Sequence, residues 1–255
     1  MEISTVGIVI KELRQGENDK LLTILTPNGK IFAIAKGVKK ISSKNAPACQ
    51  LFVYSEYELM QKNGRYIVKT AVSKELFYNM RADMARYSLA CYFAEVLSHV
   101  TTENNDETEA LRLFLNTLYA LANKPDIPLW RIKGAFELKL MCILGFAPDF
   151  DNCFGCGCSI EIGRSNMFSF EEAALICEKC RKGDIAFSCT VSGDTCLALK
   201  YITTSNPAGF LSFTIDDSYS AEFSFICENY LLHKTEKNYE TLKIYKSILS
   251  SLGEK

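Results

Sequence analysis

The first 75 residues alternate short apolar runs with turn-forming residues, which is a pattern typical of β-strands. The runs are rich in Val, Ile, Thr, Phe and Tyr and occupy residues 3–10, 20–26, 30–36, 51–60 and 65–73. Asn28-Gly29 and Asn63-Gly64 predict tight hairpin turns, because both residue types tolerate positive φ. Five short strands favour a small closed barrel, which leaves no exposed sheet edge. An SH3-like barrel has similar strand content, so periodicity leaves it open.

After residue 79 the apolar positions recur every three or four residues, as they do in amphipathic helices. Leu111, Leu115 and Leu118 form one such stripe, and Pro128 and Gly145 bracket a further helix at 128–144. More helices are predicted at about 192–204, 217–233 and 239–252. The sequence therefore predicts an α+β multidomain protein, with a barrel over 1–78 and a helical domain over 79–255.

Four cysteines interrupt the helical region in two closely spaced pairs. Cys153 and Cys156 form the first CxxC, and Cys177 and Cys180 form the second. Two such knuckles can direct four thiolates to one point, and Zn²⁺ with four sulfur ligands is the usual result. Such a site has no open position for substrate, so its expected role is structural. We therefore expect one Zn²⁺ in the cysteine segment at 149–183.

Three other interpretations of these cysteines remain open from the sequence. Cys158 lies two residues after Cys156 and could replace it as a ligand. Iron also suits four sulfur ligands. The cysteines could also be ordinary buried thiols, as we expect for several of the other seven.

The charge is distributed unevenly, although the net charge of the chain is only −1. Residues 1–80 carry twelve Lys and Arg against seven Asp and Glu, and residues 20–55 contain six lysines and no acid. Four of these lysines, Lys36, Lys39, Lys40 and Lys44, fall within nine residues between the third and fourth predicted strands. Lysines neutralise phosphates and release counterions, so this basic loop is a candidate nucleic-acid contact, although a merely solvated loop is the alternative. Phe32, Phe52, Tyr54 and Tyr57 could stack bases wherever they face outward.

No sequence motif for catalysis is present. There is no GxSxG, no GK[ST] phosphate loop and no HExxH. A nuclease would need an open metal position or paired carboxylates, so a binding protein is expected rather than an enzyme. A protein–protein adaptor whose barrel binds no nucleic acid is the main alternative. The sequence also has no signal-peptide pattern and no apolar run that could cross a bilayer, which predicts a reducing cytoplasm without disulfides.

These parts together resemble the RecO family of bacterial recombination-mediator and DNA repair proteins. The resemblance lies in the opening GIVIKELRQGENDKLLTILTPNGKIFAIAKGVKK, in FELKLMCILGFAPDFDNCFGCG, and in LICEKC. It implies an OB-fold, a helical domain and a zinc-ribbon-like insertion. The implied DNA contacts are Arg14, Lys36, Lys39, Lys40 and Lys44, and the implied metal ligands are Cys153, Cys156, Cys177 and Cys180.

The resemblance also implies activities and partners. The family binds single- and double-stranded DNA, anneals complementary strands, and with RecR helps RecA to load onto DNA coated by single-strand-binding protein. A protein of this type is cytoplasmic and associates with the nucleoid during repair. The acidic tail of single-strand-binding protein needs an apolar pocket rimmed by cations, for which Arg131, Lys133 and Lys139 are candidates. Relatives often have Gly-Gly before the second knuckle, where this chain has Ala173 and Ala174, and that departure concerns the local turn more than the metal.

Overall fold

The computed structural model describes residues 2–62, 65–181 and 187–253. The chain forms two compact units. Unit 1 comprises Met1–Lys124 and Tyr239–Lys255, and unit 2 comprises Pro125–Asn238. The barrel thus shares unit 1 with the helices that directly follow it and with the C-terminal helix. The predicted domain boundaries at 78 and at 149–183 stay predictions.

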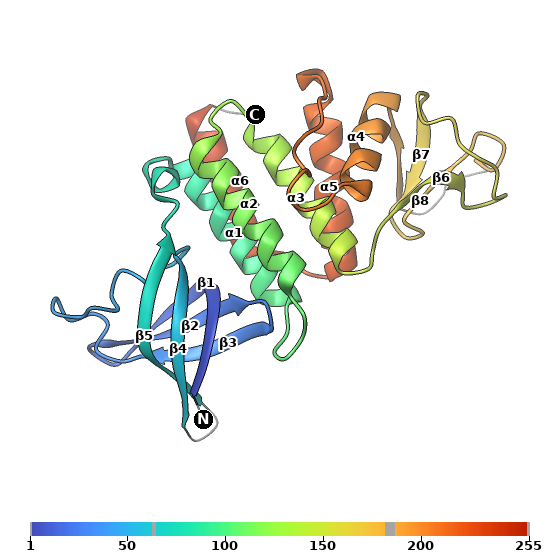
Figure 1. Ribbon diagram of the computed structural model, residues 1–255. Helices are drawn as coiled ribbons and strands as arrows, with labels where there is room; N and C mark the ends of the chain where they lie inside the picture. Colours follow the sequence, from blue (N-terminus) through green and yellow to red (C-terminus); the bar gives the residue numbers. More distant parts are fainter. Residues whose placement is uncertain (1, 63–64, 182–186, 254–255) are drawn as a thin grey trace. The chain divides into compact units, whose positions relative to one another are not determined.

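A closed five-stranded barrel forms the first part of unit 1 (Figure 1). Its strands are β1 (Glu2–Gln15), β2 (Asp19–Thr26), β3 (Gly29–Ala35), β4 (Tyr54–Lys62) and β5 (Arg65–Glu75). They follow the order β1-β2-β3-β5-β4, with β4 also paired to β1, and only β3 and β5 run parallel. This Greek-key closure is of the OB type and confirms the predicted fold class.

Two strand boundaries differ from the sequence prediction. Strand β1 continues to Gln15, five residues beyond the expected end, because its outer half pairs with β2 through the whole hairpin. Strand β4 begins at Tyr54 rather than at residue 51, because Phe52 takes a left-handed conformation with φ 64°. The second predicted turn, Asn63-Gly64, lies outside the described residues, but β4 and β5 on either side pair antiparallel from Lys62 and Arg65 onward.

The tip of the β2–β3 hairpin binds the barrel to the helices of unit 1. The backbone N–H of Lys30 donates to Thr102 O at 2.8 Å, and its Nζ donates to Ser98 O at 2.7 Å. Gly29 has φ +104°, and a Cβ there would lie 2.7 Å from Thr102 O. Glycine is therefore required both for the turn and for the close approach of the two backbones.

The helices of unit 1 are η1 (Tyr78–Ala82), α1 (Met84–Val100), α2 (Thr108–Asn123) and α6 (Glu240–Leu252). Asp83 caps α1 by accepting a hydrogen bond from Arg86 N. Helix α6 packs along α1 (Figure 1), where Glu95 accepts from both the backbone and the hydroxyl of Thr241. The C-terminal helix predicted from the sequence is therefore confirmed, and it completes the first unit.

Unit 2 combines three helices with a small sheet. The helices are α3 (Leu129–Ile143), α4 (Gly193–Thr204) and α5 (Ser220–Thr235), with the short η2 (Asp217–Tyr219) before α5. The strands are β6 (Asp149–Cys153), β7 (Asn166–Ser169), β8 (Ala174–Ile176) and β9 (Ser188–Val191), in the order β6-β8-β7-β9. Strand β9 lies beyond the segment predicted for the cysteine insertion. Helix α3 packs against both α4 and α5.

Helix α3 buries two of the cations expected to rim a surface pocket. Lys133 is 4% exposed and forms ion pairs of 2.8 Å with both Glu137 and Glu228. Lys139 is 6% exposed and donates to backbone carbonyls at the end of α4, including Ile202 O and Ser205 O. The sequence prediction for these two lysines is therefore wrong, because their charges are used inside unit 2.

Candidate nucleic-acid interface and metal centre

A β-bulge in β1 decides which side chains face the mouth of the barrel. Val9 pairs with Ile24 and points into the core, but Lys11 pairs with Thr23, so one extra residue lies between them. After the bulge, the even-numbered residues share the inner face. Glu12 pairs with Leu22, a core residue, and Leu13 turns outward, where it is 50% exposed. Bulges commonly redirect a side chain in this way at functional sites.

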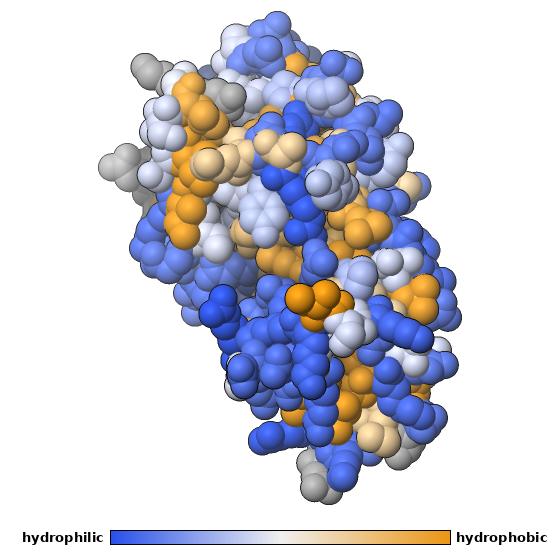
Figure 2. Space-filling view, turned by 90° about the vertical axis from the view of Figure 1, so that its left-hand side faces the viewer, coloured by the Kyte–Doolittle hydropathy of each residue, from blue (hydrophilic) through white to orange (hydrophobic). Residues whose placement is uncertain are grey.

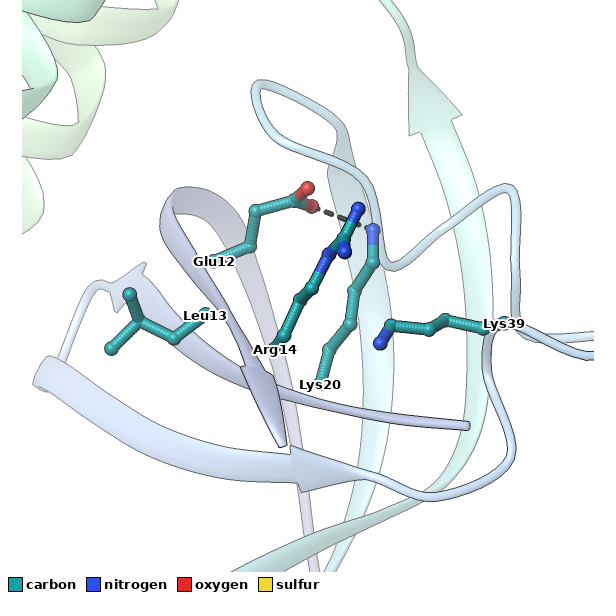
Figure 3. A pocket seen from close by; sticks show the side chains of 5 residues that line it. All are labelled: Glu12, Leu13, Arg14, Lys20 and Lys39. Carbon is teal, nitrogen blue, oxygen red and sulfur yellow. Dashed lines mark hydrogen bonds and ion pairs between the residues drawn. The ribbon is translucent and has the colours of Figure 1, made fainter. Parts of the chain in front are cut away.

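Three cations converge at this mouth from separate segments of the chain. Arg14 lies opposite Lys20 across β1 and β2, and Lys39 approaches from the loop between β3 and β4. Together with Glu12 and Leu13 they line a cavity of about 420 Å³. Figure 3 shows the Arg14 and Lys20 side chains running side by side and Lys39 extending toward them from the loop, whereas Leu13 points away. The structure thus brings together two of the five residues predicted to contact DNA.

The loop that carries Lys39 is anchored by its backbone. Asp19 Oδ1 accepts a 2.7 Å hydrogen bond from Gly37 N, and Lys39 N donates to Asn18 O at 3.0 Å. Val38, which lies between Gly37 and Lys39 in the sequence, is only 4% exposed and packs into the barrel core. The start of the basic loop is therefore held against the β1–β2 turn, where Lys39 Nζ donates to Gly16 O at 3.4 Å and to Glu17 O at 3.3 Å. Within the described residues Lys39 forms no ion pair with a carboxylate.

The other three lysines of the basic loop are exposed and do not line this cavity. Within the described residues, none of Lys36, Lys40 and Lys44 forms an ion pair. Their exposure suits contact with an extended polyanion, but nothing brings them to one point. Hydrophilic side chains cover most of the barrel in the lower half of Figure 2, with apolar residues scattered between them.

Sequence reasoning missed two cations near the mouth. Lys20 was part of a predicted strand, and only its pairing with Arg14 across the hairpin places it at the site. Arg81 lies in η1 and lines a second cavity of about 390 Å³ together with Glu12, Lys20 and Lys39. The hairpin pairing could have indicated Lys20, but no local pattern indicates Arg81.

Only some of the candidate stacking aromatics are accessible. Phe52 and Tyr57 are fully buried, and Tyr57 donates from its hydroxyl to Ala48 O at 2.9 Å. They belong to the core and cannot stack bases. Phe32 is 41% exposed and Tyr54 is half-buried, so these two stay candidates.

The four predicted cysteine ligands lie together at one end of the small sheet. Strand β6 ends at Cys153, and β8 ends at Ile176, directly before Cys177. Because β6 and β8 are parallel neighbours, their C-terminal ends deliver both knuckles to the same edge. The Sγ atoms of Cys153, Cys156, Cys177 and Cys180 all lie within 4.8 Å of one another.

The spacing of these thiols fits a tetrahedral metal site. The Sγ atoms of Cys156 and Cys177 are 3.8 Å apart. A tetrahedron with metal–sulfur bonds of about 2.3 Å has edges of roughly 3.8 Å. The group can therefore hold one metal ion, and the alternative of unrelated buried thiols does not describe it.

The backbone around the first knuckle favours the thiolate form of Cys153. Burial opposes ionisation, but backbone N–H groups of Cys177, Cys156 and Gly155 outweigh it and lower the pKa of Cys153 to about 6. Cys177 N donates to this sulfur at 3.3 Å. A Cβ on Gly155 would lie 3.1 Å from the Cys180 sulfur, so glycine leaves room for the fourth ligand.

Cys158 lies beside the group of four thiols, which forms without it, and its side chain hydrogen-bonds with those of Cys156 and Cys177. Its carbonyl accepts a 2.8 Å hydrogen bond from Cys153 N, which closes the knuckle, and its side chain is exposed. Ala173 precedes β8 with φ +53°, a left-handed conformation that glycine adopts more readily. The left-handed turn is thus formed by an alanine in this chain, and the Ala173 carbonyl accepts a hydrogen bond from Asp149 N at 2.8 Å.

The barrel closure and the thiol group together define an OB-type barrel protein with a four-cysteine ribbon. A family model described as recombination protein O, N terminal, matches residues 1–77, and the corresponding C-terminal model matches residues 81–243. The chain therefore belongs to the recombination protein O (RecO) family of DNA repair proteins.

Individual relatives match over nearly the full chain. DNA repair protein RecO of Acetivibrio thermocellus is 34% identical and covers 96% of this chain and 97% of the relative. The protein of the same name from Alkaliphilus metalliredigens is 33% identical, with 97% and 100% covered. That of Clostridium perfringens is 30% identical, with 96% and 98% covered. Among the described residues, no helix has the length and apolar character needed to span a membrane.

Proposed function

We propose that this protein is a non-enzymatic recombination mediator that binds single- and double-stranded DNA and anneals complementary strands. With RecR, it helps RecA to load onto single strands coated by single-strand-binding protein, whose C-terminal tail is a further partner. It acts in the cytoplasm, at the nucleoid during repair. Family membership supports this proposal, and the convergence of Arg14, Lys20 and Lys39 at the barrel mouth carries it.

Annealing on such a surface needs no covalent chemistry. Two strands repel each other through their phosphates, and a cationic surface screens that repulsion and raises the local concentration of strands. Arg14 and Lys39 at the mouth, with Lys36, Lys40 and Lys44 on the exposed loop, would share phosphates along the strand. Such contacts are independent of base sequence, as a mediator that acts at any break requires.

The direct test is the salt dependence of DNA binding by a double variant, K39A/K40A. Loss of two phosphate contacts should weaken binding to every sequence and flatten the slope of log K against log salt by about 1.8 for duplex DNA. The matched control is K69A/K74A, which removes two lysines of the same barrel that are paired with Glu2 and Glu56. If both double variants change the slope equally, the loop is not in the interface.

An annealing assay separates the mediator from an adaptor. Complementary oligonucleotides, bare or coated with single-strand-binding protein, should pair faster with the protein than without it, and the strands should remain intact with Mg²⁺. A protein that binds RecR but leaves labelled DNA unbound at low salt would be an adaptor. Strand cleavage would instead indicate a nuclease.

We further propose that the four cysteines bind one structural Zn²⁺. The sulfur spacing fits the metal, and four thiolates leave no open coordination position, so the ion would fix the two knuckles rather than act on substrate. Metal analysis of the purified protein tests this, with about one zinc per chain expected. Iron in its place would be recognised by its absorption spectrum.

A further inference from the structure

The cavity at the barrel mouth adjoins a second cavity that leads away from the barrel. Both are lined by Glu12, Lys20 and Lys39. The first adds Arg14, and the second adds Arg81 and Tyr87, which lie in η1 and α1 of the same unit. The two hollows therefore form one cationic path from the barrel mouth to the start of the first helix.

The far end of this path is ordered before any ligand binds. Arg81 Nη2 donates to Leu51 O at 2.5 Å, which orients the guanidinium; its other N–H groups meet no acceptor among the described residues and can bind an anion. The Tyr87 ring packs edge-on against the buried Phe52, with centroids 5.6 Å apart. A half-buried ring beside a fixed guanidinium offers a contact for a phosphate and for an unstacked base.

One acid stands among the cations of the path. Within the described residues, Glu12 is the only acidic residue that lines either cavity. Its Oε2 lies 2.8 Å from Lys20 Nζ, and the two side chains are 34% and 20% exposed (Figure 3). Because the pair is partly open to solvent, its net stabilisation is small and an incoming phosphate can compete for Lys20.

We propose that single-stranded DNA follows this path to Arg81, and that Glu12 is a built-in competitor that holds Lys20 and keeps the affinity below its maximum. This inference rests on the proposed DNA-binding function and adds to it a contact outside the barrel and a control on the strength of binding. A carboxylate at this position repels phosphates and occupies a lysine. A mediator that must later release the strand benefits from such a limit on its grip.

The test measures binding of a labelled single-stranded oligonucleotide by fluorescence anisotropy across a salt series. E12Q should bind roughly fivefold more tightly, with a slope steeper by about 0.7, because Lys20 becomes free for a phosphate. The control E56Q removes the same charge from a barrel pair with Lys74 that lines neither cavity, and should change affinity less than about twofold. R81A should bind roughly fivefold more weakly, with a slope shallower by about 0.7.

Two further variants serve as controls for R81A. R112A removes an exposed arginine of α2 in the same unit, paired with Glu109, and should leave binding nearly unchanged. R81K keeps the positive charge and should retain most of the affinity if Arg81 contacts a phosphate, whereas a loss as large as that of R81A would show that Arg81 acts only through its bond to Leu51 O. If E12Q and E56Q change the DNA affinity equally, Glu12 is not a competitor for Lys20. If R81A and R112A change it equally, the DNA path does not extend beyond the barrel to Arg81. No binding by the unaltered protein would instead overturn the proposed function itself.

Discussion

Two lysine–glutamate contacts of equal length lie in opposite surroundings in this protein. Lys20 and Glu12 at the barrel mouth are 2.8 Å apart and partly exposed, whereas Lys133 lies 2.8 Å from Glu137 and is almost fully buried. The first pair exchanges easily with water and ions. The second cannot separate without leaving a charge inside unit 2, so it serves the fold. The two contacts have the same length but different roles, and the burial of each pair determines its role.

The same contrast extends to the two regions as a whole. Unit 1 holds its cations at a surface hollow, on strands and a loop whose backbone is fixed independently of them. Unit 2 uses Lys133 and Lys139 internally and gathers four thiols at one edge of a small sheet. Changes to the polar groups of unit 2 should thus disturb folding, and changes at the mouth should disturb binding.

Removal of a metal ligand should give the largest structural effect. C177S should lose the metal, disorder the ribbon and expose its remaining thiols to alkylation, since metal binding and folding are coupled at such sites. DNA binding by the barrel should change little. C158S is the matched control and should keep its metal, because Cys158 is not part of the four-sulfur group. A metal-free C158S with a fully loaded C156S would instead assign the ligand role to Cys158.

The second prediction concerns the buried ion pair. K133M leaves Glu137, which is 0% exposed, without its cation and should lower the free energy of unfolding of unit 2 by about 3–5 kcal/mol. Trp130, the only tryptophan of the chain, lies on α3 and reports this unfolding by fluorescence in urea.

K20M is the control at the surface pair, and its cost should stay below about 1 kcal/mol. The probe for this variant is hydrogen exchange of the β1 and β2 amides, because Trp130 belongs to the other unit. Equal losses for K133M and K20M would refute the distinction drawn between the two pairs.

These cases also show how far the sequence could go. The paired CxxC spacing predicted the thiol group, because a local pattern and a common metal geometry determine it. Strand and helix patterns predicted the barrel and the C-terminal helix. Lys133 and Lys139 were misjudged because charge in a sequence says nothing of burial, which depends on how α3 packs against α4 and α5.

The barrel mouth shows a second limit of prediction from the sequence. Simple alternation from Val9 would place Leu13 inside and Arg14 outside, and the bulge reverses both. A single extra residue is invisible to a pattern of period two, and a register shift moves every later side chain to the other face. Arg81 reaches the same hollow only through the tertiary fold, so no local signal could reveal it.

A smaller loss should follow replacement of the glycine that docks the barrel. G29A forces alanine to φ +104° and places its Cβ 2.7 Å from Asn104 N and Thr102 O. A loss of about 2–3 kcal/mol is expected, visible as faster hydrogen exchange in β2, β3 and the α1–α2 loop. G16A, at a positive φ with open space around it, is the matched control and should cost about 1 kcal/mol. Equal effects would mean that the backbone contact with Thr102 contributes little.

The smallest expected effect is an increase in the stability of unit 2, opposite in sign to the loss of stability expected for G29A. Ala173 adopts φ +53° before the second knuckle, a conformation that disfavours any side chain. A173G should relieve this strain and raise the stability of unit 2 by about 1 kcal/mol, partly offset by the greater freedom of glycine in the unfolded chain. Urea unfolding followed at Trp130 measures the change.

The neighbouring A174G is the control and should destabilise unit 2, because Ala174 is 6% exposed within strand β8 and needs no left-handed backbone. A loss of stability in both variants would show that the alanine turn is unstrained.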